Sequence, residues 1–128
     1  MITFLYAGLL GLLLFYISLE TIKGRRKHLI SLGAGQNNEI EQLVAAHSNF
    51  ASYTPTLLIL LALAEMSGRT HPYAIHILGL MILSGRVFHF TAFRNKMNFT
   101  HRKLGMYLTL WPLLGLALWN IVLYCKVI

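Results

Sequence analysis

Hydrogen-bonding side chains stand at the start of an otherwise apolar stretch, AAHSNFASYTPTLLILLALA, which spans residues 45–64. In an α-helix one face of this stretch would hold Asn49, Ser52, Tyr53 and Thr56, with Ala45 extending it. Amide, hydroxyl and phenol groups on one face can orient a polar ligand through hydrogen bonds. The same groups can bond a neighbouring membrane helix, so the pattern predicts either a binding site or a polar helix contact.

Cationic side chains occur at a matching depth in the two apolar runs that follow. Arg86, His89 and Phe93 are spaced for one helical face, and Arg102 opens the last run. Asn49 and Arg86 would each lie roughly 12 Å inside the same end of an antiparallel helix pair. An ionisable group buried at the centre of a membrane helix costs ~2.5–3.5 kcal/mol and usually serves a site. Arg86 could alternatively extend its guanidinium to the headgroups.

Two arginines near an amide and a phenol suit an anionic ligand. A guanidinium can bind a carboxylate through two parallel hydrogen bonds. A cation beside a thiol lowers its pKa and so raises the fraction of thiolate. A peptide with two carboxylates and a thiol, such as glutathione, would use both properties, while apolar walls would admit a lipophilic electrophile. These residue types predict a class of ligand, and composition alone does not name it.

Four long apolar runs must position these groups, at about residues 2–22, 41–66, 72–94 and 103–125. Each is close to the ~20 residues that cross a bilayer as a helix, and none alternates as barrel strands do. Hydrophobic residues make up 56% of the 128 residues, which leaves too little polar surface for a soluble domain of this size. We predict a single all-α membrane domain over residues 1–128, built as a bundle of four transmembrane helices.

The first run could be a signal peptide or a retained helix. No basic segment precedes its apolar stretch, and no small-residue cleavage site precedes Lys23. We therefore expect a retained helix. Pro72 suits the first turn of the third helix, and Asn98 or Thr100 is expected to cap the fourth. Pro55 and Pro112 each remove a backbone donor and should bend their helices.

The net charge of +7 is arranged as in a membrane protein. Basic residues gather at 23–27 and at 94–103, whereas the opposite side has Arg69 and Lys126. The positive-inside rule makes those two basic regions cytoplasmic and places both termini on the non-cytoplasmic side. Anionic headgroups account for the excess charge, and no basic–aromatic patch indicates nucleic acid. The single cysteine, Cys125, provides neither a disulfide framework nor a metal cluster, and we expect no metal site.

Two segments carry a resemblance to a known family. They are RRKHLISLGAGQNNEIEQLVAAHSNFASYTPTLLILLALAEMSG, with the motif AHxNFxxYxP, and LGLMILSGRVFHFTAF, with the motif GRxxH. On these segments the chain resembles the MAPEG family, the membrane-associated proteins in eicosanoid and glutathione metabolism, and most closely its small bacterial members. The resemblance implies a left-handed four-helix bundle in the bacterial inner membrane. It also implies a homotrimer that binds glutathione between neighbouring subunits, near the cytoplasmic side.

The resemblance also implies roles for individual residues. Arg102 matches the arginine at the start of helix 4 that is proposed to stabilise the glutathione thiolate, which makes it the expected catalytic residue. The glutathione-binding residues that it implies are His47, Asn49, Tyr53, Arg86 and His89. Characterised members conjugate glutathione, as co-substrate, to lipophilic electrophiles, reduce hydroperoxides, or isomerise eicosanoid precursors.

Three positions depart from the family pattern. Ala45 stands where many relatives have Arg, Ser52 where most have Glu, and Phe93 where several have Tyr. The arginine would hold a carboxylate, and the glutamate would take the ligand's amino group or an arginine. Loss of one such charged contact costs ~1.5–3 kcal/mol, which is about tenfold or more in affinity. The family includes a non-enzymatic lipid-binding member, five-lipoxygenase-activating protein, so a silent site has precedent.

Three functions therefore remain open from the sequence. The first is a membrane-bound glutathione-dependent transferase or peroxidase acting on lipophilic electrophiles. The second is a non-catalytic MAPEG scaffold that binds a lipid or a membrane partner, because Ala45 and Ser52 lack the family's charges. The third is a small four-helix exporter, which would need an acidic residue deep in the first helix. Glu20 lies near that helix's end and is expected to pair with Lys23 or Arg25 instead.

Overall fold

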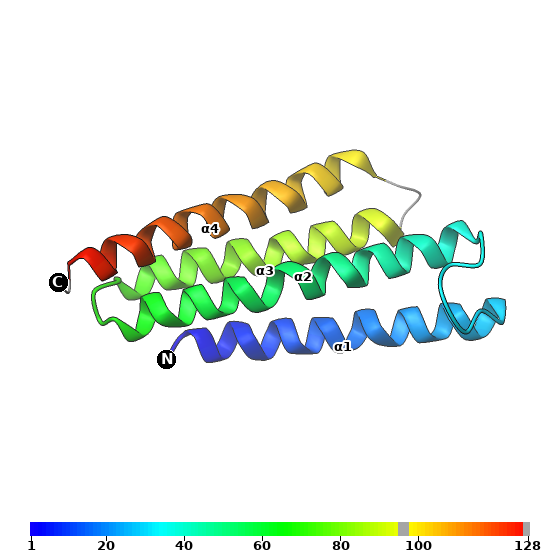
Figure 1. Ribbon diagram of the computed structural model, residues 1–128, viewed down its shortest axis with the longest axis horizontal. Coiled ribbons are helices and arrows are strands. Elements are labelled where there is room, and N and C mark those ends of the chain that lie inside the picture. The colour runs from blue at the N-terminus through cyan, green and yellow to red at the C-terminus, as the bar shows by residue number, and fades with distance from the viewer. Residues whose placement is uncertain (95–97, 127–128) are drawn as a thin grey trace.

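Four antiparallel helices make up the computed structural model, which describes residues 1–94 and 98–126 (Figure 1). In chain order they are α1 (Thr3–His28), α2 (Asn38–Met66), α3 (Pro72–Arg94) and α4 (Phe99–Cys125). The two termini lie at the same end of the molecule as the α2–α3 connection (Figure 1). The α1–α2 and α3–α4 connections lie at the opposite end, which we call the basic end because residues 23–27 and Arg94 are there.

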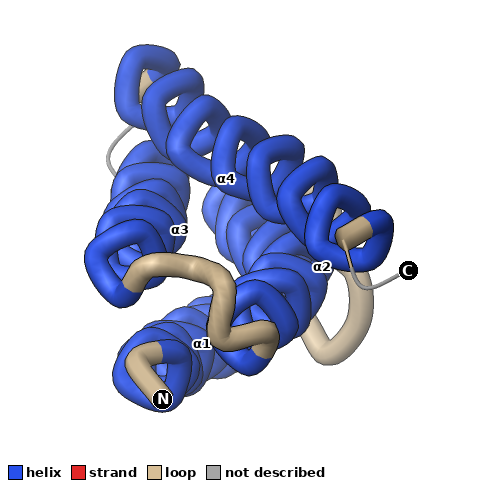
Figure 2. Tube along the Cα trace, turned by 90° about the vertical axis from the view of Figure 1, so that its left-hand side faces the viewer, coloured by secondary structure: helices blue, strands red, loops and turns tan. Residues whose placement is uncertain are grey.

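The helices are arranged in layers rather than as a closed square. α1 packs on α2 and α3, and α4 lies across α2 and α3 from the other side (Figure 2). Among the described residues, α1 and α4 do not contact each other. The buried apolar core contains Leu10 and Ile17 of α1, Leu57 and Leu61 of α2, Ile82 of α3 and Leu116 of α4. Because α2 and α3 form the middle layer, polar groups on them can meet inside the bundle.

The predicted helices are confirmed, and their ends differ from the apolar runs. α1 continues through the basic segment to His28, because Lys and Arg are good helix formers and their charge favours the last turn of a helix, although Gly24 lies among them. It ends where Leu29 adopts a left-handed conformation with φ of 56°. α3 begins at Pro72 as expected, and the predicted cap of α4 is Asn98, whose side chain accepts from Thr100 N and His101 N.

Three of the four helices are long and apolar enough to cross a membrane, by their length and composition: α1, α3 and α4. The polar residues in the first half of α2 keep that helix outside this group, although it has 29 residues and lies alongside the other three (Figure 1). Membrane crossing by α2 therefore stays a prediction. α2 and α4 both continue as helices through the interior prolines Pro55 and Pro112.

Two glycines bring α3 and α4 into backbone contact near the basic end. A Cβ added to Gly105 would lie 2.7 Å from the backbone N of His89, and one added to Gly85 would lie 3.1 Å from the carbonyl carbon of Leu108. Only a residue without a side chain permits so close an approach. This contact fixes α4 against the segment of α3 that carries Arg86 and His89.

Candidate functional site

A buried arginine joins three helices at the centre of the candidate site. Arg86 of α3 is only 1% exposed. Its Nη1 donates a hydrogen bond of 2.7 Å to Oδ1 of Asn49 on α2, and its Nη2 donates to the hydroxyl of Thr109 on α4. Its guanidinium carbon lies 5.7 Å from the centroid of the Tyr53 ring. The sequence prediction that Asn49 and Arg86 lie at one depth is therefore confirmed.

An open cavity of about 460 Å³ lies beside this arginine, and we call it the polar cavity. Its lining residues come from α2, α3 and α4 and are Ala45, Ser48, Asn49, Ser52, Tyr53, His89, Phe93 and Arg102. Four of the five residues on the predicted face of α2 thus line one space, whereas the exposed Thr56 does not. His89 and Arg102 reach this space from the other two helices. None of the chain's four acidic residues lines the cavity, so the basic groups around it have no carboxylate there.

Arg102 lies on the boundary between two spaces of different character. Its guanidinium carbon lies 5.4 Å from the centroid of the Phe93 ring, on the side of the polar cavity. It also lines a second space of about 370 Å³, the apolar groove, together with Phe99, Lys103, Met106, Tyr107 and Leu110. Asn49 links the two spaces, because its amide nitrogen lies 3.9 Å from the sulfur of Met106. Arg102 can therefore act on a polar and an apolar molecule at once.

Thr109 is a site residue that sequence reasoning missed. Its side chain is fully buried, and its hydroxyl donates to the carbonyl of Gly105 at 2.7 Å while it accepts from Arg86. Its position offered a signal, because it follows Arg102 by seven residues and so lies on the same face of α4. A threonine on that face of an apolar helix is a candidate partner for a buried cation.

His47 does not line the polar cavity. Its Nε2 lies 3.1 Å from the hydroxyl oxygen of Ser18 on α1, and that hydroxyl donates to the carbonyl of Leu14 at 2.8 Å. The serine oxygen therefore accepts from the histidine. His47 lines a separate space of about 350 Å³, the α1–α2 groove, whose polar lining residues are Ser18, Thr21, Arg25, His47 and Ser48. Ser48 lines this groove and the polar cavity alike.

The two family departures on α2 both line the polar cavity. Ala45 contributes only a methyl group, and the Ser52 hydroxyl donates back to the carbonyl of Ser48 at 2.8 Å. Neither supplies a charge. Among the described residues, Arg86 has no carboxylate partner and its Nε atom has no hydrogen-bond partner. Asn49 and Thr109 therefore accept hydrogen bonds from the Arg86 guanidinium without neutralising its positive charge.

Comparisons with known proteins place this chain among membrane proteins. The family model described as "MAPEG family" matches residues 3–122. The Inner membrane protein YecN of Escherichia coli strain K12 is 31% identical over 121 residues, which covers 94% of this chain and 91% of the relative. The protein of the same name from E. coli O6:H1 shows the same identity of 31% over the same shares of 94% and 91%.

Proposed function

Because this chain belongs to the MAPEG family and is an integral membrane protein, we propose that it is a glutathione-dependent transferase or peroxidase acting on lipophilic electrophiles. The observation that carries this function is the position of Arg102, which lines the polar cavity and the apolar groove together. An enzyme that joins a peptide thiol to an apolar molecule must bring both to one place. Arg102 is the cation at that place.

Arg102 would stabilise the glutathione thiolate. A cation beside a thiol raises the thiolate fraction, and the thiolate is the nucleophile. In conjugation the sulfur forms a bond to the electrophilic carbon while the leaving group departs with its electron pair. With a hydroperoxide the sulfur takes the terminal oxygen and an alcohol leaves, and a second glutathione then gives the disulfide and water. Both reactions begin with the same thiolate, so one arginine can serve both.

The remaining residues would bind and orient the peptide. Asn49, Tyr53 and His89 present hydrogen-bonding groups to the polar cavity. Arg86 has a different role from direct capture of a carboxylate, because it is only 1% exposed and does not line the polar cavity. It fixes the amide of Asn49 and adds positive charge beneath it. The cavity then favours an anionic peptide, because its cations lack a protein counter-charge.

We place the complete site between neighbouring copies of a homotrimer in the inner membrane, with the basic end in the cytoplasm. The α1–α2 groove and the polar cavity meet at Ser48. A neighbouring copy that turns its α1–α2 groove toward the polar cavity would add Arg25 and His47 to the site. Arg25 would then supply the charge that Ala45 lacks.

Calorimetry and enzyme assay test this function directly. The purified protein in detergent should release heat on glutathione titration and conjugate 1-chloro-2,4-dinitrobenzene. Arg102→Met should lower the conjugation rate by about tenfold or more, since a charged hydrogen bond contributes ~1.5–3 kcal/mol. Lys103→Met is the matched control, because Lys103 lines the apolar groove only. Absence of both heat and conjugation in the native protein would refute the function.

A non-catalytic scaffold is the second candidate, and the chemistry of Ala45 and Ser52 favours it. Neither provides the charge that the family uses to hold glutathione, so the same cavity would serve a lipid or a membrane partner. In that case the double variant Ala45→Arg/Ser52→Glu should bind glutathione while the native protein does not. Glutathione conjugation by the native protein would exclude the scaffold.

A further inference from the structure

A third space, of about 570 Å³, lies among α1, α2 and α3 at the basic end, and the proposed function does not use it. We call it the charged cavity. Its charged lining residues are Glu20, Lys23, Lys27, Glu39 and Arg94. Phe93 is 8% exposed and lines both this cavity and the polar cavity. The two cavities share no other lining residue, so we treat the charged cavity as a separate space.

The two carboxylates of the charged cavity are each shared by two basic groups. Glu20 lies 3.2 Å from Arg94 and 3.5 Å from Lys23, which confirms the predicted Lys23 partner. Arg94 also donates to the hydroxyl of Tyr16. Exposed pairs of this kind contribute little to stability. With three cations against two carboxylates, the lining keeps a net positive charge.

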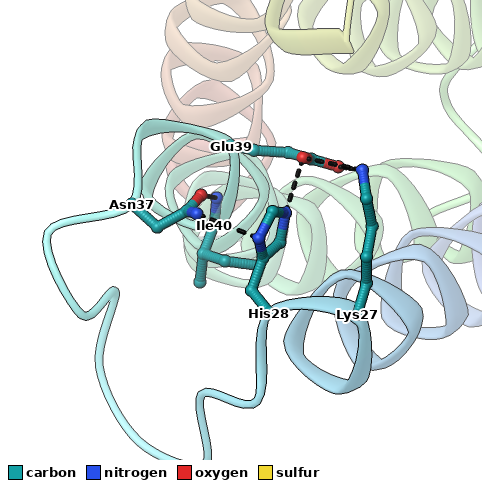
Figure 3. A network of polar contacts seen from close by, with 5 residues as sticks. All are labelled: Lys27, His28, Asn37, Glu39 and Ile40. Atoms are coloured by element: carbon teal, nitrogen blue, oxygen red, sulfur yellow. Dashed lines mark hydrogen bonds and ion pairs between the residues drawn. The ribbon is translucent and has the colours of Figure 1, made fainter.

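The second carboxylate, that of Glu39, lies between the His28 ring and the Lys27 ammonium (Figure 3). The distances are 2.7 Å to His28 Nε2 and 3.2 Å to Lys27 Nζ. The other ring nitrogen of His28 lies 3.1 Å from the side-chain nitrogen of Asn37, the residue that caps α2. The end of α1 is thus fixed to the start of α2, and Lys27 is held at the cavity.

The helices α1 and α2, which line the charged cavity, also pack closely against each other. A Cβ added to Gly24 would lie 2.7 Å from Cδ1 of Leu43, so α1 and α2 approach each other closely here. Gly24 and Leu43 both line the cavity. Helices rather than a loop therefore form its walls.

The charged cavity lies where the chain passes from apolar to basic sequence. The apolar run of α1 ends at Ile22, directly before Lys23. Leu12 precedes Lys23 by eleven residues, about three helical turns, and so lies on the same face of α1 nearer the bilayer centre. Its side chain is 69% exposed. Cations at the headgroup level, above an exposed apolar face, match the two parts of a phospholipid.

We propose that the charged cavity binds the phosphate of an anionic phospholipid headgroup, with the acyl chains along the exposed apolar face of α1. Basic pockets between transmembrane helices at the cytoplasmic side bind such headgroups. Lys23 and Lys27 each carry three donors, of which the carboxylates use only part. The proposed lipid site is a different space from the proposed glutathione site, so lipid binding can be measured whether or not the protein binds glutathione.

Native mass spectrometry of the delipidated protein in detergent tests this site. We expect tighter binding of dioleoyl phosphatidylglycerol than of dioleoyl phosphatidylcholine. Lys27→Gln should weaken phosphatidylglycerol binding about fivefold, the effect of one charge near an anionic surface. Arg26→Gln is the matched control, since Arg26 is its neighbour on α1 with the same charge but lies outside the cavity, and it should leave binding unchanged.

Three results would overturn the lipid site. Equal binding of the two lipids would remove the role of headgroup charge. An equal loss in Lys27→Gln and Arg26→Gln would assign the effect to the basic segment as a whole. Complete displacement of phosphatidylglycerol by millimolar glycerol 3-phosphate would indicate a site for soluble phosphate. Circular dichroism of each variant verifies that the helices are intact, and Lys23→Gln provides an independent second variant.

Discussion

Arg86 of α3 and Asn49 of α2 are joined by a hydrogen bond of 2.7 Å from Nη1 to Oδ1, deep in the bundle. Among the described residues, no carboxylate pairs with this arginine. A neutral amide satisfies part of a buried guanidinium but leaves its charge unneutralised. That charge makes the neighbouring polar cavity favourable for an anion. The same bond holds the Asn49 amide in one orientation beside the cavity. One contact therefore links the packing of the helices to the chemistry of the site.

Asn49→Ala should destabilise the protein by about 1.5–3 kcal/mol, because it removes a hydrogen bond to a buried charged group. The expected result is a lower midpoint of thermal unfolding in detergent, followed by circular dichroism. Ser48→Ala is the matched control, since Ser48 is the exposed neighbour whose side chain has no such buried partner. Equal midpoints for Asn49→Ala and the native protein would contradict the role given to this contact.

Tyr53→Phe should separate ligand binding from packing. The phenylalanine ring retains the contact with the Arg86 guanidinium, which lies 5.7 Å from the ring centroid, so the stability should change little. Loss of the phenol should weaken glutathione binding about threefold to tenfold, the effect of one hydrogen bond. Calorimetry measures the affinity. Unchanged affinity together with unchanged stability would remove Tyr53 from the binding residues.

The fold was largely predictable from the sequence, because the length of each apolar run and the charge of each connection limit the possible arrangements. The polar cavity was predictable in part, since helical periodicity alone places Asn49 and Tyr53 on one face. Periodicity could not show that Arg86 donates hydrogen bonds to both Asn49 and Thr109, because the contact with Thr109 depends on how closely Gly85 and Gly105 bring α3 to α4. Helix contacts of this kind depend on tertiary packing, which local patterns do not encode.

Two glycine substitutions on α4 should have opposite effects on stability. Gly105→Ala would place a Cβ 2.7 Å from the backbone N of His89, so α4 must move and the cost should be about 1–3 kcal/mol. Gly115→Ala meets nothing within 4 Å and should stabilise the helix by up to about 1 kcal/mol. Thermal unfolding of both variants measures the difference. A Gly105→Ala protein as stable as Gly115→Ala would show that the two helices are not in close contact.

The tie between α1 and α2 should weaken in acid. Glu39 lies ahead of the apolar part of α2. A hydrogen bond from His28 and, to a smaller extent, one from Lys27 hold the pKa of its carboxyl below the ordinary value. A carboxyl whose pKa is lower in the folded state contributes stability above its unfolded pKa and loses it as the pH falls through the folded pKa. Stability should therefore decline below about pH 4, by at most about 1 kcal/mol from this exposed group.

Limited proteolysis of the α1–α2 connection measures that decline locally. An acid-active protease such as pepsin should cut the native connection faster at pH 3 than at pH 4. In Glu39→Gln, which cannot titrate at this position, the cutting rate relative to an unstructured peptide should be the same at both values. A native protein whose relative rate is equally insensitive to pH would contradict the role of Glu39.

If the chain forms the proposed homotrimer, mixed trimers should reveal whether one site contains residues from two copies of the chain. Arg102 and Arg25 line different spaces of one protomer, the polar cavity and the α1–α2 groove. If neighbouring copies combine these spaces, Arg102→Met and Arg25→Gln homotrimers should both conjugate poorly. Each mixed trimer should then contain one intact site out of three, about a third of the native sites, because an intact site needs one copy of each kind in the right order. Differently tagged, tandem-purified mixtures measure the recovery. Activity no higher than the average of the two parents would place the whole site within a single protomer.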